Sequence, residues 1–115
     1  SSDPVFSVAD TVKWYKKMKK YYRKCTNKFT RLFIVPGMSH SKGGPSCDQH
    51  ELFDALVSWV ENGQAPDQVE SRVNPGNSDV PADWSPERSR PLCAYPKVPV
   101  YIGGDVEDAS SFVCE

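Results

Sequence analysis

The sequence predicts an α/β fold in which one buried strand lies between two amphipathic helices. Apolar residues recur at helical spacing in two stretches, near residues 8–23 and 48–62, and a short apolar run at 31–35 separates them. With 38% hydrophobic and 25% charged residues, the 115-residue chain has the composition of a globular protein. One strand cannot form a sheet alone, so we expect the chain to be part of a larger α/β domain.

The first helix is expected to begin after Ser7 and to continue to about Arg23. Ser7 and Asp10 form a capping box with Asp in place of the usual Glu. The lysines among these residues are interpreted as the solvated face opposite an apolar stripe. The stripe consists of Val12, Tyr15, Met18 and Tyr22. No recognition motif accompanies the basic charge, so we expect no nucleic-acid partner.

The run at 31–35 is typical of a strand buried on both faces, as in a parallel sheet, because it is nearly all apolar and stops at Pro36 and Gly37. A second helix should follow from Asp48, with Asn62 and Gly63 as its C-terminal cap. Residues 1–66 thus have an αβα order.

Residues 67–115 differ from the rest in composition, because prolines punctuate short extended pieces at 69–73 and 98–102. We expect a tail that packs along the same domain, with one further helical turn near residues 106–112. No apolar run approaches the ~20 residues that span a bilayer, so no membrane partner is expected.

Four cysteines, an even number without a C-x-x-C pair, favour disulfides formed in an oxidising compartment: Cys25, Cys47, Cys93 and Cys114. A zinc site made from Cys25, His40, Cys47 and His50 is the alternative. Its spacing matches no common zinc finger, so disulfides are the simpler interpretation.

His40 is the main candidate for chemistry. It lies in a loop rich in small residues directly after the expected strand, where functional groups gather in open α/β sheets. Asp3, before the first helix, is the candidate partner, because a carboxylate that accepts from the imidazole Nδ1–H leaves Nε2 free to take a serine proton. No G-x-S-x-G elbow occurs in the chain, so the serine is expected elsewhere. The alternatives are a histidine that caps the next helix and an Asp-Pro turn without a role.

The motif Pro-Gly-Met-Ser-His at 36–40, the Gly-Gly-Pro at 43–45 and the closing Arg-Pro-Leu-Cys at 90–93 strongly resemble the C-terminal part of the tannase and feruloyl esterase family. Further matching stretches lie at 3–7, 10–12, 14–15, 32–35, 53–56, 59–66, 95–96, 108–109 and 112–114. The resemblance therefore covers nearly the whole chain.

The resemblance implies a secreted or periplasmic α/β-hydrolase that cleaves esters of phenolic acids such as ferulate or gallate. Asp3 matches the acid of its catalytic triad and His40 the base, both within an αβα core at 1–66. Cys93 and Cys114 match a disulfide that staples the tail at 67–115. The family's calcium site belongs to a lid domain outside this chain, so no cofactor is expected here. The chain alone should be inactive, because the serine and the rest of the hydrolase polypeptide are needed.

Ser41 departs from the family pattern, in which a cysteine after the histidine is bonded to a cysteine before the serine. Either the protein positions its triad without that bridge, or Cys47 takes a neighbouring role; a pairing of Cys25 with Cys47 is slightly favoured. The departure keeps a second hypothesis open, a non-catalytic binding or structural module that is stabilised by disulfides and derived from an esterase.

Overall fold

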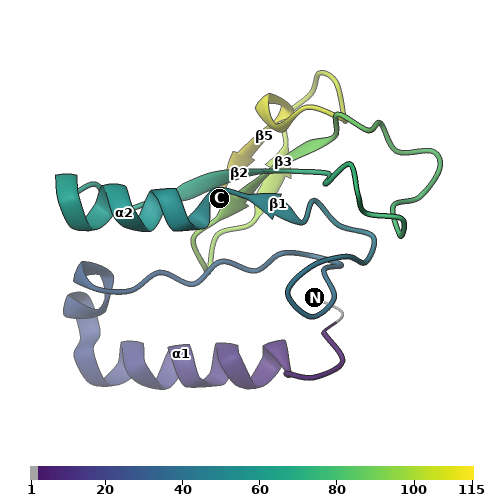
Figure 1. Cartoon of the computed structure of the whole chain (residues 1–115). Coiled ribbons are helices and arrows are strands. Elements are labelled where there is room, and N and C mark those ends of the chain that lie inside the picture. Colours follow the sequence, from purple (N-terminus) through teal and green to yellow (C-terminus); the bar gives the residue numbers. More distant parts are fainter. Residues whose placement is uncertain (1–2) are drawn as a thin grey trace.

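A computed structural model describes residues 3–115 as two helices and two small antiparallel sheets (Figure 1). The helices are α1 (Val8–Tyr22) and α2 (Leu52–Asn62), and 3₁₀ turns occupy Arg23–Lys28 and Ala109–Ser111. One sheet has the order β1 (Gln49–His50), β2 (Gln68–Arg72), β3 (Ser89–Cys93), and the other pairs β4 (Pro99–Tyr101) with β5 (Phe112–Cys114). The chain is thus a small mixed α/β segment.

Both expected helices are confirmed, although α2 begins at Leu52 and not at Asp48, and local signals explain the start of α1 and the end of α2. The Ser7 hydroxyl accepts a hydrogen bond from the Asp10 N–H at the start of α1. Gly63 ends α2 in the left-handed conformation, with φ 71°. Among the described residues, no helix has the length and apolarity needed to cross a membrane.

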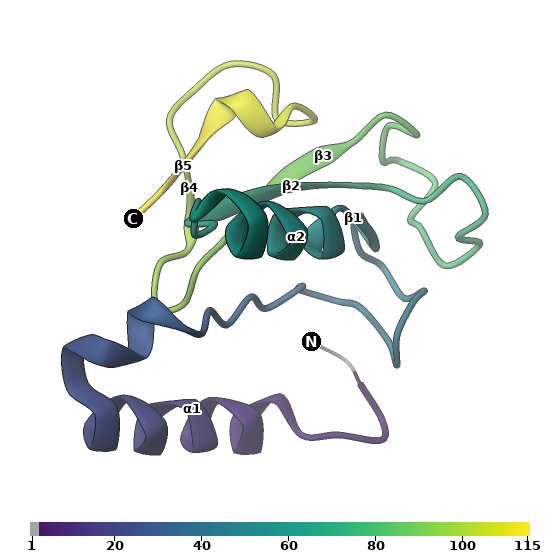
Figure 2. The ribbon, with the colours of Figure 1, turned by 60° about the vertical axis from the view of Figure 1, so that its left-hand side comes forward.

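The contacts of α1 with the rest of the chain centre on Tyr15. This side chain is only 2% exposed, and its ring packs edge-on against the ring of Tyr95 with 6.0 Å between centroids. Figures 1 and 2 show the chain between α1 and β1 running as an extended layer between that helix and the three-stranded sheet. The loop at residues 36–45, which carries His40 and is called the histidine loop, belongs to this middle layer.

The expected strand at 31–35 makes little pairing within the described residues, and its pairing with a sheet outside this chain stays a prediction. Phe33 makes one isolated antiparallel bridge to Ala94, and the Tyr95 N–H donates to the Leu32 carbonyl at 2.8 Å. An apolar run becomes a strand only when neighbouring backbones pair along it, and within residues 3–115 no other backbone does so. The expected burial holds at Val35, which is 8% exposed.

The tail contains a sheet, which is more order than its prolines suggest. The expected extended pieces correspond to β2 and β4, and the last helical turn corresponds to the 3₁₀ turn at Ala109–Ser111. Strand β3 pairs with β2 in antiparallel register from Gln68 opposite Cys93 to Arg72 opposite Ser89. The expected disulfide between Cys93 and Cys114 is confirmed and joins β3 to β5.

Removal of this disulfide by Cys93→Ser/Cys114→Ser is expected to lower the free energy of unfolding by about 3 kcal/mol, because the bridge restricts the unfolded chain across a separation of 21 residues. Urea unfolding of the oxidised protein measures the change. Cys25→Ser is the matched control, since Cys25 is an exposed free thiol, and it should change stability by less than about 0.5 kcal/mol. Equal stability of the two variants would contradict the prediction.

Candidate functional site

The loop that carries His40 is closed on itself by close backbone contacts. Gly37 and Gly44 both have φ 76°, and the Gly44 backbone packs so closely on Gly37 that a Cβ at Gly44 would lie 2.3 Å from the Gly37 carbonyl oxygen. Within this closure the Ser39 N–H donates to the Gly43 carbonyl at 3.1 Å. His40 therefore sits in a tight turn with both ends fastened.

The structure brings together the two residues that the sequence singles out, although 37 positions separate them. His40 Nδ1 lies 3.1 Å from Asp3 Oδ2. The His40 side chain is 47% exposed, whereas that of Asp3 is 18% exposed. Of the hydrogen bonds made by residues 3–115, the Asp3 bond is the one that reaches the imidazole. Nε2 is therefore free to meet a group from outside these residues.

Backbone N–H groups keep the Asp3 carboxylate in place. Its Oδ1 accepts from the Val5 N–H at 2.7 Å and from the Phe6 N–H at 3.1 Å. These two bonds, together with the contact to His40, lower the pKa of Asp3 below its ordinary value. An ionised carboxylate only accepts hydrogen bonds, so the proton of the pair belongs on Nδ1 of His40.

The Phe6 ring lies beside the imidazole, with 5.6 Å between the ring centroids. On the other side of the loop, Ser41 adopts φ 67°, a left-handed conformation that is uncommon outside glycine. His40 is thus flanked by an aromatic ring and a sharp backbone turn.

A second set of polar residues, which the sequence analysis did not single out, connects the histidine loop to the rest of the chain by hydrogen bonds. Asp48 Oδ2 accepts from the Gly43 N–H at 2.8 Å, while Oδ1 accepts from the Asn77 side chain at 3.1 Å and from the Asn74 N–H at 3.3 Å. Burial opposes the charge on Asp48, but these donors outweigh it and hold the pKa of the carboxyl below its ordinary value. Asp48 is therefore an anion buried among donors.

Residues of the β2–β3 connection complete this support. The Asn77 amide also donates to the Gly44 carbonyl at 2.9 Å, and Asp79 Oδ2 accepts from the Gly44 N–H at 2.9 Å. Asn74 and Asn77 each cap their own turn through the side-chain oxygen. Turn residues of this kind are visible in the sequence, but their partner loop is not.

The expected pairing of Cys25 with Cys47 is wrong, because both thiols are free. Cys25 is exposed in the 3₁₀ turn after α1, whereas Cys47 is buried and its thiol lies 3.8 Å from the Arg88 carbonyl oxygen. Burial raises the pKa of the Cys47 thiol. Within residues 3–115, no three His, Cys, Asp or Glu side chains lie close enough together to hold a metal ion.

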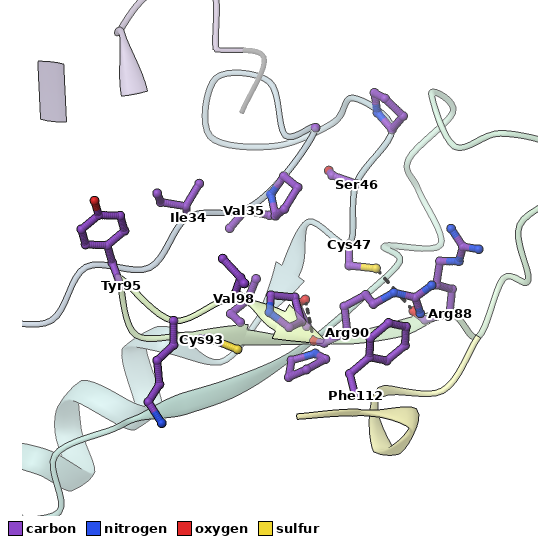
Figure 3. A pocket seen from close by; sticks show the side chains of 18 of the residues that line it. Ile34, Val35, Ser46, Cys47, Arg88, Arg90, Cys93, Tyr95, Val98 and Phe112 are labelled. Carbon is purple, nitrogen blue, oxygen red and sulfur yellow. Dashed lines mark hydrogen bonds between the residues drawn. The ribbon is translucent and has the colours of Figure 1, made fainter. Parts of the chain in front are cut away.

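A cavity of about 560 Å³ opens between the 34–37 segment, Cys47 and strand β3 (Figure 3). Its walls are mainly apolar, and Arg88 and Arg90 reach it from β3 and the preceding residues. Arg88 forms a bidentate ion pair with Glu107 at 2.5 and 2.6 Å. His40 is not among the lining residues, so this cavity is distinct from the His40–Asp3 pair.

Comparisons with known proteins agree on one family. The family described as tannase and feruloyl esterase matches residues 1–115. Mono(2-hydroxyethyl) terephthalate hydrolase from Piscinibacter sakaiensis is 41% identical over 115 residues, which cover 98% of this chain and 18% of that protein. Feruloyl esterase B from Aspergillus niger is 30% identical over 139 residues, covering 99% of this chain and 24% of that protein.

Solved structures give the same result for the fold. The crystal structure of feruloyl esterase B from Aspergillus oryzae superposes with a TM-score of 0.74 at 26% identity, over 98% of this chain and 25% of that one. An esterase from the same organism superposes with a TM-score of 0.78 at 22% identity, with the same coverage. The chain spans a quarter or less of the length of these relatives.

Gly44→Ala is expected to destabilise the protein more than Gly63→Ala does. Both glycines have positive φ, which costs an alanine about 1–2 kcal/mol. A Cβ at Gly63 meets nothing within 4 Å, whereas at Gly44 it collides with the Gly37 carbonyl and adds about 1–3 kcal/mol. Urea unfolding of both variants checks the difference; equal losses would show that the loop is not closed as described.

Proposed function

The chain belongs to the tannase and feruloyl esterase family, and we propose that it supplies two members of a serine esterase triad, the base His40 and the acid Asp3. The nucleophilic serine belongs to a part of the polypeptide outside this chain. In this proposal, residues 3–115 form the C-terminal part of an α/β-hydrolase, which is the setting that the family membership implies.

The contact between Asp3 Oδ2 and His40 Nδ1 carries the proposal. The carboxylate holds the imidazole in the tautomer with a proton on Nδ1 and stabilises the imidazolium that forms during the reaction. Two backbone donors fix the other carboxylate oxygen, so the acid is oriented before any substrate binds. These contacts go beyond what a histidine that merely caps a helix would need.

The reaction is acyl transfer through a covalent intermediate. The serine oxygen attacks the ester carbonyl carbon, and His40 Nε2 takes the serine proton. The tetrahedral intermediate collapses with cleavage of the bond to the alcohol oxygen, and the imidazolium returns the proton to that alcohol. Water then attacks the acyl-enzyme with His40 again as base, releasing the carboxylic acid and the serine. The chain alone turns over no ester, because the serine is missing.

Esters of aromatic acids are the proposed substrates. The relatives are named for feruloyl esters and for mono(2-hydroxyethyl) terephthalate, and both have an aromatic ring that bears the acyl carbonyl or is conjugated to it. A phenolic acid such as ferulate or gallate is the favoured acyl group. The Cys93–Cys114 disulfide supports a secreted or periplasmic location, where such bridges form and persist.

His40→Ala in the full-length protein is expected to reduce kcat on the order of 10⁶-fold for methyl ferulate, methyl gallate and mono(2-hydroxyethyl) terephthalate, because the base of the triad is lost. Steady-state kinetics measures the loss. His50→Ala is the matched control, since it removes the other histidine of the chain and should leave turnover nearly unchanged. A fully active His40→Ala variant would refute the triad and favour a non-catalytic module.

Asp3→Asn is expected to lower kcat by about 10⁴-fold with little change in fold. The asparagine carbonyl can still accept from the Val5 and Phe6 N–H groups, but its amide favours the wrong tautomer of His40. Asp10→Asn serves as the control, because Asp10 is exposed and pairs only with Lys13 in the helix. Similar kcat values for the two variants would remove Asp3 from the mechanism.

A further inference from the structure

One residue of the histidine loop, Gly43, is held through both its N–H and its carbonyl group. The Gly43 carbonyl accepts from the Ser39 N–H at 3.1 Å and from the Ser46 hydroxyl at 3.1 Å. The Gly43 N–H donates to Asp48 Oδ2 at 2.8 Å. Because Ser39 directly precedes His40, the position of the Gly43 backbone constrains where the histidine lies.

We propose that Asp48 is a positioning residue for His40, whose carboxylate holds the backbone of Gly43 and through it the turn that presents the imidazole to Asp3. The inference rests on the proposed function, because it concerns the same triad. Asp48 does not touch the imidazole in this arrangement; it acts through Gly43 and Ser39.

The contacts of Asp48 show why a carboxylate is needed at this position. Three donors converge on it, from Gly43, Asn74 and Asn77, and only a group with two acceptor oxygens can accept from all of them. The residue is 9% exposed, so a donor that lost its acceptor would be poorly served by water. The lowered pKa of Asp48 is consistent with an anion that stays charged in this setting.

The donors Asn74 and Asn77 also show which part of the fold the histidine loop is attached to. Asn74 and Asn77 lie in the connection that leaves β2, so Asp48 ties the histidine loop to the sheet. Asp79 and Asn77 hold Gly44 to the same connection, whereas Asp48 holds Gly43, the residue that accepts from the Ser39 N–H. Displacement of a reacting group by about 1 Å can cost roughly 100-fold in rate.

The test compares Asp48→Ala, Asp48→Asn and Asn77→Ala in the full-length protein on methyl ferulate. Asp48→Ala should lower kcat about 10- to 100-fold with KM nearly unchanged, when kcat is expressed per folded molecule from the thermal unfolding curve. Asp48→Asn keeps an acceptor for the Gly43 N–H and should recover part of the loss. Asp83→Asn is the matched control, since Asp83 is an exposed carboxyl of the β2–β3 connection outside this set of hydrogen bonds.

If Asp48 has a purely structural role, Asp48→Ala should reduce the number of folded molecules while each folded molecule keeps the normal kcat. That result overturns the inference. If Asp48→Ala fails to fold, Asn77→Ala decides, because it removes the amide that donates to Asp48 and to the Gly44 carbonyl and leaves the carboxylate. Its kcat should fall about 3- to 10-fold, and an unchanged kcat refutes the inference. Collapse of His40→Ala with full activity of Asp48→Ala would overturn this inference alone. Activity of His40→Ala would overturn the proposed function, and this inference with it.

Discussion

The antiparallel ladder between β2 and β3 is the interaction on which the rest of the described structure depends. Its two ends hold the two ends of the histidine segment, residues 33–48. Beyond one end of β3, Ala94 bridges to Phe33, where the extended segment begins. Beyond the other end of the ladder, Asn74 and Asn77 bind Asp48, where the histidine loop ends. A slip of one residue in the ladder would turn its side chains to the opposite faces and would move one end of the segment relative to the other.

The β2–β3 ladder also contributes to the placement of Asp3. Asp3 precedes α1, and that helix packs through Tyr15 against Tyr95, the second residue after β3. The carriers of Asp3 and His40 are therefore fastened to adjacent residues, Tyr95 and Ala94. This common anchor helps to place α1 beside the histidine segment, and Asp3 and His40, 37 positions apart, meet at 3.1 Å within that arrangement. The contact does not require a direct link between α1 and the histidine loop.

Local sequence signals predicted the helices, but they did not predict contacts between residues that lie far apart in the sequence. The Ser7 cap and Gly63 act within one helical turn, so both helices could be predicted. The 31–35 run is apolar and partly buried as expected, and the bridge from Phe33 to Ala94 is a contact that no local pattern reveals. The pairing of Cys25 with Cys47 failed for a related reason, since an even count of cysteines says nothing of distance. Loop position and the family resemblance both pointed to His40 and Asp3, whereas the acceptor role of Asp48 emerged only from the fold.

The position of the His40 imidazole in this candidate site is set by residues that take no part in the proposed reaction. A loop rich in glycine can form the close turn around His40, but the same freedom lets it adopt many other conformations. Hydrogen bonds from outside the loop select one of them: Asp48 and Asp79 accept from the N–H groups of Gly43 and Gly44. Both acceptors are carboxylates, and charge-assisted hydrogen bonds are stronger than neutral ones. The flexibility that lets the backbone approach so closely is thus compatible with a fixed imidazole, because the constraint is supplied by Asp48, at the end of the loop, and by Asp79 of the β2–β3 connection.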